Sequence, residues 1–399
     1  MDMRIFDTVR AIAVVTCGAR AAFTFAAAAL MWAGASGAIA QAPELDASLN
    51  EAVVTIPNKS GLFTIELETT LYKPDGNGPF PVVVINHGKA HGDTRFQSRF
   101  RPAVAVRYFM HRGYAVVVPM RQGFSKSGGS YISGGCNIES NGRVQAEDVK
   151  AVLDHVATQP WADRERMLVV GQSHGGWTTL AFGARNYPGV KGIVNFAGGL
   201  RQETCPAWQM GLANAAANYA KETRLPSLWL YGDNDSYFDE TTYRRMYEQY
   251  ATAGGNAKLI AFGKFASDAH TLFVARAGAP IWQPEMTRFL ASIGLPSEAQ
   301  PNFARYGVAT PLPVPERTDF AALGDVAQVP HMRDTGRDGY KLYLTKQLPR
   351  AFALAPNGAW GFGEGGDDPL RRALANCNRH GNGDCRLYSV DDYVVWKAP

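Results

Sequence analysis

The sequence lacks the features that mark nucleic-acid-binding and membrane proteins. Its formal net charge is only +4 over 399 residues, and no segment combines a basic cluster with interleaved aromatic residues, as nucleic-acid binding requires. After the N-terminal segment, no apolar run approaches the ~20 residues that a membrane-spanning helix needs. Internal repeats and low-complexity tracts are also missing. We therefore expect no nucleic-acid partner and no stable membrane span once a signal peptide is removed.

Cysteine is scarce as well, with five residues in the chain. Their spacing matches no zinc site, because neither paired Cys-x-x-Cys motifs nor a flanking histidine pair is present. Four of the five lie beyond the N-terminal segment: Cys136, Cys205, Cys377 and Cys385. An even number in an oxidising compartment predicts two disulfides, although four cysteines allow three connectivities. We expect Cys377 to pair with its neighbour Cys385, which leaves Cys136 for Cys205; buried free thiols are the alternative.

The N-terminal segment has the layout of a secretory signal. Three arginines precede an apolar, alanine-rich run at 21–32, and small residues follow at 38–40. This order of a charged part, an apolar part and a small-residue cleavage site is typical of signal peptides. We expect residues 1–40 to be a signal peptide cut after Ala40, with Cys17 leaving in it, and the mature protein to be periplasmic or secreted. A membrane anchor is the alternative, but the run is short for one.

The rest of the chain has ample core material, with 46% hydrophobic and 19% charged residues. Its apolar runs alternate with helical patterns from about residue 53 to residue 295. The expected strands are 64–71, 81–85, 114–118, 167–170, 192–196, 227–231 and 258–262, and the expected helices are 146–157, 176–185, 242–250 and 285–292. Continuous apolar strands separated by helices indicate a mostly parallel sheet covered by helices. The sequence therefore predicts an α/β fold at 50–295, with its site at the carboxyl ends of the strands.

Proline marks the end of this domain. Residues 296–315 contain Pro296, Pro301, Pro311, Pro313 and Pro315, and such a stretch is not expected to carry a regular core element. We interpret it as a linker. The residues that follow, 316–399, have apolar material of their own and are expected to form a small C-terminal domain.

The motif Gly171-Gln172-Ser173-His174-Gly175 carries the first chemical signal. By itself a G-x-S-x-G is weak evidence in a glycine-rich sequence, but here a buried-type strand precedes it and a helical pattern follows. A strand, a sharp turn and a helix expose the serine as a nucleophile, and small flanking residues let the two elements approach each other. A glycine-rich turn in another doubly wound fold is the alternative. A serine hydroxyl also needs a base that an acid holds in place.

Chain order selects the base. In folds with this turn the order is serine, acid, histidine, so only His270, His331 and His380 qualify. The last two lie beyond the proline-rich stretch, which leaves His270 as the expected base. The acid should follow strand 227–231, where Asp233 and Asp235 are both available, and spacing alone does not choose between them.

Backbone N–H groups must also face the negative charge that develops during acyl transfer. One expected donor is the amide of His174, the residue after the nucleophile. The other comes from the loop after strand 81–85, where Gly88 permits a tight turn and Lys89 offers its amide. No metal or organic cofactor is expected.

Together these residues resemble the dienelactone hydrolase group of α/β-hydrolases and, more loosely, the prolyl oligopeptidase and acyl esterase groups. The matching pieces are Asn86-His87-Gly88, Arg121-Gln122-Gly123-Phe124-Ser125, Gly171-Gln172-Ser173-His174-Gly175, Gly232-Asp233-Asn234-Asp235 and Asp268-Ala269-His270. The resemblance implies Asp235 as the acid, through a G-x-x-D pattern, and the Lys89 amide as the second oxyanion donor. Dienelactone hydrolase itself is a small cytosolic enzyme with a cysteine nucleophile, so its substrate is not carried over. The C-terminal residues look like a small module of exported bacterial proteins.

The sequence thus predicts an exported serine esterase that acts on a small-molecule ester through an acyl-enzyme. One alternative is a serine peptidase of the prolyl oligopeptidase type, although only a few residues precede the first expected strand, where such enzymes usually carry a propeller. A non-catalytic envelope binding protein is the other.

The long connection 197–225 is interpreted as a lid over the site. A Cys136–Cys205 bridge would tie this lid to the loop after strand 114–118 and preorganise the pocket; the alternative is that the bridge only stabilises the fold. The positive charges of Lys89, Arg121 and Lys126 suggest an acidic acyl group as a further hypothesis. Protein partners are not predicted.

Overall fold

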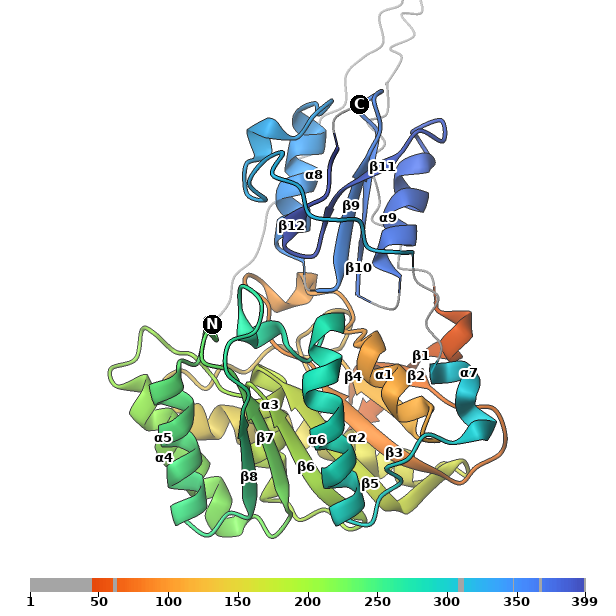
Figure 1. The fold of residues 1–399 in the computed structure, drawn as a ribbon. Helices are drawn as coiled ribbons and strands as arrows, with labels where there is room; N and C mark the ends of the chain where they lie inside the picture. The colour runs from red at the N-terminus through yellow and green to blue at the C-terminus, as the bar shows by residue number, and fades with distance from the viewer. Residues whose placement is uncertain (1–44, 60–62, 308–311, 347, 366–367, 398–399) are drawn as a thin grey trace, which may run out of the picture. The chain divides into compact units, whose positions relative to one another are not determined.

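The computed structural model describes residues 45–59, 63–307, 312–346, 348–365 and 368–397 (Figure 1). All of these residues belong to one compact unit. The expected signal peptide at 1–40 lies outside the described residues. Within the described part of the chain, no helix has both the length and the apolar character needed to cross a membrane.

The larger domain is built on one mixed sheet, which has eight strands among the described residues in the order β1-β2-β4-β3-β5-β6-β7-β8. Its strands are β1 (Glu51–Asn58), β2 (Ile65–Tyr72), β3 (Phe80–Asn86), β4 (Ala115–Pro119), β5 (Ala162–Gln172), β6 (Val190–Phe196), β7 (Ser227–Tyr231) and β8 (Ala257–Ala261). The β1–β2 and β2–β4 pairs are antiparallel, and the pairs from β4 through β3 to β8 are parallel. The predicted α/β architecture with a mostly parallel sheet is confirmed.

Helices cover both faces of this sheet (Figure 1). They are α1 (Ala103–Met110), α2 (Ile138–Ala157), α3 (His174–Gly183), α4 (Trp208–Glu222), α5 (Glu240–Thr252) and α6 (Ala279–Ser292). Successive strand residues point to opposite faces, and the two cores divide accordingly: Val83 packs in the core with α1 and α6, whereas Val82 and Val84 pack in the core with α2, α3, α4 and α5. Burial on both faces explains why the strands are apolar without alternation.

The structure differs from the sequence prediction at three places. β1 and α1 were not predicted. α6 starts before the predicted residue 285 and carries Pro284 in its interior. The proline-rich stretch also contributes to the large domain, because a short helical segment, η5 (Pro301–Phe303) and α7 (Ala304–Gly307), buries Tyr306 in the core. The Tyr306 hydroxyl accepts from Asn50 Nδ2 at 3.0 Å and from the Asp75 amide at 2.8 Å, which ties this segment to the loops beside β1 and β2.

The C-terminal residues form a small antiparallel sheet, in the order β10-β9-β11-β12 within the described residues. Its elements are η6 (Val326–Gln328), α8 (Asp334–Leu344), β9 (Arg350–Leu354), β10 (Trp360–Glu364), α9 (Pro369–Asn378), β11 (Arg386–Val390) and β12 (Tyr393–Val394). Phe352 and Leu354 of β9 share a core with Tyr340 and Tyr343 of α8. The intervening residues of β9 are alanines that share a core with α9, so their small size lets that helix approach the sheet.

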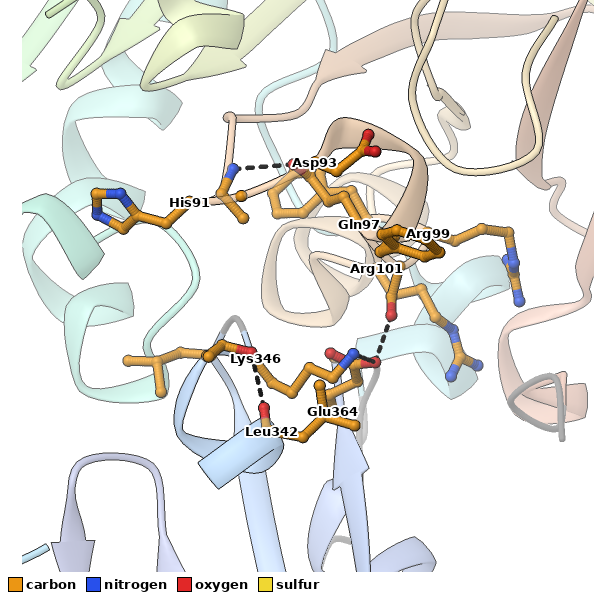
Figure 2. Close-up of a pocket in the computed structure, with 16 residues that line it drawn as sticks. His91, Asp93, Gln97, Arg99, Arg101, Leu342, Lys346 and Glu364 are labelled. Atoms are coloured by element: carbon orange, nitrogen blue, oxygen red, sulfur yellow. Dashed lines mark hydrogen bonds and ion pairs between the residues drawn. The ribbon is translucent and has the colours of Figure 1, made fainter. Parts of the chain in front are cut away.

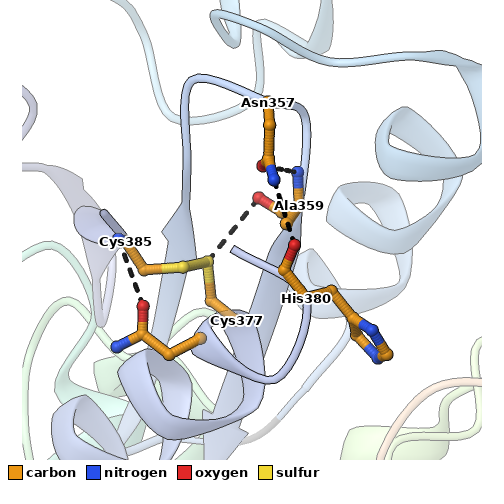
Figure 3. The surroundings of a disulfide bond; sticks show 6 residues. Asn357, Ala359, Cys377, His380 and Cys385 are labelled. Carbon is orange, nitrogen blue, oxygen red and sulfur yellow. Dashed lines mark hydrogen bonds between the residues drawn. A yellow bond between two sulfur atoms is a disulfide. The ribbon is translucent and has the colours of Figure 1, made fainter. Parts of the chain in front are cut away.

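Both expected cysteine pairs are disulfide-bonded, Cys136 with Cys205 and Cys377 with Cys385. Figure 3 shows the second pair, which joins α9 to the loop before β11. The same loop is held by the Asn357 side chain, which donates to the His380 carbonyl at 3.0 Å. This disulfide therefore fixes one edge of the C-terminal module.

Candidate active site

Ser173 lies on the sharp turn between β5 and α3. Its backbone has φ 57° and ψ −126°, a left-handed conformation that costs a non-glycine residue energy and is held only by its surroundings. Those surroundings leave no room for a side chain at the two glycines of the motif, Gly171 and Gly175. A Cβ atom on Gly171 would come within 2.1 Å of the Gly175 carbonyl oxygen, and one on Gly175 within 2.2 Å of the Asn86 carbonyl oxygen. The two glycines of the motif are thus required by close backbone approach.

The structure brings Ser173, His270 and Asp235 together in one hydrogen-bonded chain. His270 Nε2 lies 2.8 Å from Ser173 Oγ, and His270 Nδ1 lies 2.9 Å from Asp235 Oδ2. The Asp235 side chain is fully buried, while that of His270 is 11% exposed. This arrangement leaves Nε2 free to accept the serine proton if Nδ1 holds the proton shared with the carboxylate.

Asp235 is held in place by the backbone of the residues that follow it. Its Oδ1 accepts from the amides of Tyr237 at 2.8 Å and Phe238 at 3.0 Å. Asp233, the other acid that the sequence left open, points elsewhere and accepts from the Tyr243 hydroxyl at 3.0 Å. Of the two aspartates after β7, only Asp235 contacts His270 in the described structure.

The loop that carries His270 is fixed from two directions. Asp268 Oδ1 accepts from the His270 amide at 2.9 Å, and Gln172, beside the serine, donates from Nε2 to the His270 carbonyl at 3.1 Å. The imidazole packs against Tyr237, with ring centroids 4.4 Å apart. The position of the ring therefore depends on both the β5–α3 turn and the loop after β7.

The loop after β3 comes close to the serine. A Cβ atom on Gly88 would lie 3.1 Å from Ser173 Cβ, so this backbone passes directly over the nucleophile. The Gly88 carbonyl is turned away, since it accepts from Gln97 Nε2 at 3.0 Å and contacts His87 Nδ1 at 2.6 Å. In a trans peptide the N–H points opposite to the carbonyl, so the Lys89 amide faces the other side of this loop. His174 is the first residue of α3, so its amide has no acceptor within the helix.

Beneath the turn lies a buried polar network that the sequence reasoning missed. Arg121 is 0% exposed; its Nη2 lies 3.0 Å from His174 Nδ1, and its Nε donates to Gln145 Oε1 at 3.1 Å. His174 Nε2 lies 2.8 Å from Asn141 Oδ1. A guanidinium is only a donor, so His174 accepts at Nδ1 and donates from Nε2 as a neutral imidazole. Burial, followed by the charges of Arg121 and Lys89, holds the pKa of His174 well below its usual range.

His87 is fixed in the opposite tautomer. The Arg121 amide donates to His87 Nε2 at 3.0 Å, so the proton of the neutral ring is on Nδ1, directed at the Gly88 carbonyl. Burial, with the Arg121 charge second, holds the pKa of His87 well below its usual range. His87, two residues before Lys89, and His174, whose own amide is the other expected oxyanion donor, are therefore both neutral and both hydrogen-bonded to Arg121.

The burial of Arg121 also bears on the acidic acyl group considered from the sequence. Burial lowers the pKa of Arg121 to about 10, and its polar atoms face His174 and Gln145 rather than a surface. Lys126 is exposed and Lys89 lies over the Tyr131 ring, at 5.8 Å from its centroid. The three positive charges do not converge on one point, so the structure gives no support to a site for an anion there.

The connection interpreted as a lid is mostly α4, the ordinary crossover helix between β6 and β7. Leu212, Ala216 and Tyr219 of this helix are buried in the core. The Cys136–Cys205 disulfide joins the loop just before α4 to the loop before α2. The segment 197–207 that precedes α4 places Ala197 and Leu200 in the same core, and its Arg201 donates to the Ser236 carbonyl at 3.0 Å. No cluster of three or more potential metal ligands occurs among the described residues.

The strand order, the strained serine at the end of β5 and the histidine after β8 define the class of this protein. These features are those of the α/β-hydrolase fold. The model of the X-Pro dipeptidyl-peptidase family (S15 family) matches residues 61–252. Among curated proteins, no sequence matches the chain.

Similar solved structures come from both esterases and peptidases. A putative dienelactone hydrolase from Klebsiella pneumoniae is 19% identical over 61% of this chain and 98% of its own, with a TM-score of 0.44. An esterase from Pyrococcus furiosus is 16% identical over 61% of this chain and 91% of its own, with a TM-score of 0.45. Dipeptidyl peptidase 4 from Porphyromonas gingivalis is 18% identical over 61% of this chain and 35% of its own, with a TM-score of 0.46.

Proposed function

We propose that this hydrolase is an exported serine esterase that cleaves carboxylic esters through an acyl-enzyme. The observation that carries the proposal is the continuous chain from Ser173 Oγ through His270 to Asp235, with contacts of 2.8 Å and 2.9 Å. These are the distances that proton transfer from the serine to a held imidazole requires.

In the proposed mechanism, Ser173 Oγ attacks the ester carbonyl while its proton passes to His270 Nε2. Asp235 keeps the imidazole in the correct tautomer and stabilises the imidazolium. The amides of Lys89 and His174 donate to the oxygen that becomes negative. The tetrahedral intermediate collapses, and His270 protonates the departing alcohol. A water molecule, deprotonated by His270, then attacks the acyl-enzyme and releases the acid and free Ser173.

A serine peptidase is the second candidate, because the S15 peptidase model matches residues 61–252. An enzyme that releases dipeptides must hold the free ammonium group of its substrate, and an unoccupied carboxylate is the natural partner for it. The acids beside the site are already engaged: Asp235 by two amides and His270, and Asp268 by the amides of Ser236 and His270. This engagement favours an ester, whose recognition needs no such partner.

The test compares the two substrate classes on one preparation. We expect hydrolysis of 4-nitrophenyl acetate and butyrate, little release of 4-nitroaniline from Gly-Pro-4-nitroanilide, and labelling by a fluorophosphonate. Ser173→Ala should lose turnover and labelling together. Ester turnover that survives Ser173→Ala would refute the mechanism, and faster anilide cleavage would favour the peptidase. A complete lack of turnover and labelling would favour a non-catalytic binding protein.

Export forms a separate part of the proposal. It is supported by the charged and apolar layout of residues 1–40 and by the two disulfides, which persist in oxidising compartments. Expression in a bacterial host followed by fractionation should find the protein outside the cytoplasm with Gln41 as its first residue. Retention of residues 1–40 on a membrane fraction would instead support the anchor.

A further inference from the structure

A cavity of about 210 Å³ lies between the loop after β3 and the C-terminal module (Figure 2). Residues 90–101 form one side of it, and Leu342, Lys346 and Glu364 come from the other. The two sides are joined directly, since Ser98 Oγ donates to Glu364 Oε1. The cavity is therefore built by two parts of the chain that lie far apart in sequence, since Ser98 and Glu364 are separated by 266 residues.

The cavity begins close to Ser173. Gly88 is in near contact with the serine, and Ala90, which lines the cavity, is two residues further on, a span of at most about 7 Å. A second connection passes through rings: His91, another lining residue, contacts the Tyr237 hydroxyl through Nε2 at 2.7 Å, and Tyr237 packs against His270. Ser173 and His270 do not line the cavity themselves, but each is linked to its wall through near neighbours, Ser173 through the loop at Gly88 and His270 through Tyr237.

The basic side chains Arg99, Arg101 and Lys346 of the wall are already paired. Arg99 Nη1 lies 3.1 Å from Glu51 Oε1, and Arg101 forms an ion pair with the same carboxylate. Lys346 Nζ lies 3.5 Å from Glu364 Oε1. The Asp93 carboxylate is exposed and accepts from the Arg95 amide at 2.9 Å. An anionic ligand group would have to compete with the internal pairs, so the charges of the wall argue against an anion.

Two large apolar side chains of the wall are left exposed, one from each part of the chain. Phe96 is 81% exposed and Leu342 is 50% exposed. Covering such surface with an apolar group is favourable by about 25 cal/mol per Å². The size also fits a ring, because a buried cavity of roughly 150 Å³ in another protein holds benzene. An uncharged aromatic ring with a short tether matches the volume and the exposed apolar surface.

We infer that this cavity is the specificity pocket for an uncharged aryl group carried by the ester, with the C-terminal module as one of its walls. The inference rests on the proposed esterase function and names the substrate class for it: esters with an aromatic ring a few atoms from the carbonyl. Phe96 and Leu342 determine the preference, and neither is placed in the reaction itself.

The test measures acid release from three esters: ethyl acetate, benzyl acetate with the ring in the alcohol, and ethyl 3-phenylpropionate with the ring in the acyl group. We expect kcat/KM to be higher for at least one ring-bearing ester than for ethyl acetate. Phe96→Ala and Leu342→Ala should each lower that preference by about fivefold, as the loss of part of one apolar contact predicts. Hydrolysis of ethyl acetate should stay the same in both variants.

Two matched variants control for a general effect of removing an exposed apolar side chain. Phe63→Ala removes a phenylalanine that is also 81% exposed, and Leu45→Ala removes a leucine that is 46% exposed; neither residue lines the cavity. Both should keep the wild-type preference. Turnover of ethyl acetate with no preference for a ring, or a preference that Phe96→Ala and Leu342→Ala leave unchanged, would overturn the inference while the esterase stands.

If the chain hydrolyses no ester at all, the proposed function fails and the pocket is tested by binding alone. Saturation-transfer NMR with benzyl alcohol should then show binding to the wild-type chain that Leu342→Ala weakens and Leu45→Ala does not. Equal signals from the three proteins would overturn the pocket as well.

Discussion

The guanidinium of Arg121 lies 3.0 Å from Nδ1 of His174, the residue that follows the expected nucleophile. The backbone of the same arginine donates to His87 at 3.0 Å, next to the loop that carries Lys89. One residue therefore connects both segments that supply the expected oxyanion donors. It does so from a position with no exposed surface, so it acts by positioning and not by contact with substrate.

Replacing Arg121 by methionine should lower kcat far more than it changes KM. The side chain keeps its length, but His174 Nδ1 and Gln145 Oε1 lose their donors, each at a cost of about 1–3 kcal/mol. A small displacement of the oxyanion amides is enough to cost roughly 10²-fold in rate. Steady-state kinetics on a chromogenic ester measures the two constants. Lys126→Met, on the exposed part of the same loop, is the control and should behave like the wild-type protein.

Asp235 and Asp233 form a natural pair of test sites. Asp235→Asn should reduce kcat by about 10³- to 10⁴-fold, because an amide no longer selects the tautomer of His270. Asp233→Asn alters a side chain that accepts from the Tyr243 hydroxyl and not from His270, and it should leave the rate close to that of the wild-type chain. Equal losses in the two variants would contradict the assignment of the acid.

Asp148 should make stability depend on pH in an unusual direction. This carboxyl is 2% exposed, and burial raises its pKa from 3.8 to about 6 despite hydrogen bonds from Gln122 and Asn58. Between these two values the folded chain binds more protons than the unfolded chain, so this group's contribution to the free energy of unfolding falls as the pH rises. Above about pH 6 the full penalty, roughly 3 kcal/mol, is present.

Asp148→Asn removes this titration. The free energy of unfolding of the wild-type chain minus that of the variant should therefore decrease from about pH 4 to about pH 6 and then level off. Urea unfolding at several pH values gives this difference. Asp154→Asn, at an exposed position on the same helix, provides the comparison. A difference for Asp148→Asn that rises with pH would show that the carboxyl is not buried as described.

The Cys136–Cys205 disulfide should matter for stability and not for substrate preference. The two cysteines are 69 residues apart, and closing a loop of this length in the unfolded chain contributes about 4 kcal/mol in the chain-entropy model. The double variant Cys136→Ser, Cys205→Ser should unfold at a lower urea concentration while it keeps the ratio of kcat/KM between ring-bearing and small esters. An altered ratio at unchanged stability would instead favour the lid interpretation.

The fold was largely predictable because buried parallel strands are marked by uninterrupted apolar runs. The serine was predictable for a related reason: the close approach of Gly171 and Gly175 to neighbouring backbone leaves a local signature in the sequence. The choice between Asp233 and Asp235 could not be made from spacing, because both follow the same strand. Only the path of the loop determines which carboxylate faces His270, and the resemblance to a family supplied that information.

The Arg121 network and the cavity beside the C-terminal module could not be predicted from the sequence, for a different physical reason. Arginine is mostly exposed in proteins, so nothing local indicates that this one is buried. Its partners Gln145 and His174 are 24 and 53 residues away. The pocket brings together residues that are even further apart, since Ser98 and Glu364 are 266 residues apart. Contacts of this kind depend on how the whole chain packs, which no short sequence window records.

The position of Gln97 has a consequence for how such an enzyme should be assayed. Its side chain bridges the Gly88 carbonyl and the Ala90 amide, and the same residue lines the cavity. A substrate that fills the cavity would therefore contact Gln97, the side chain that holds the loop with the Lys89 amide in place. Binding energy gained at a distance can then be expressed at the reacting carbonyl, and a truncated substrate loses turnover as well as affinity. For the proposed esterase, we therefore expect kcat as well as kcat/KM to be lower for ethyl acetate than for a ring-bearing ester.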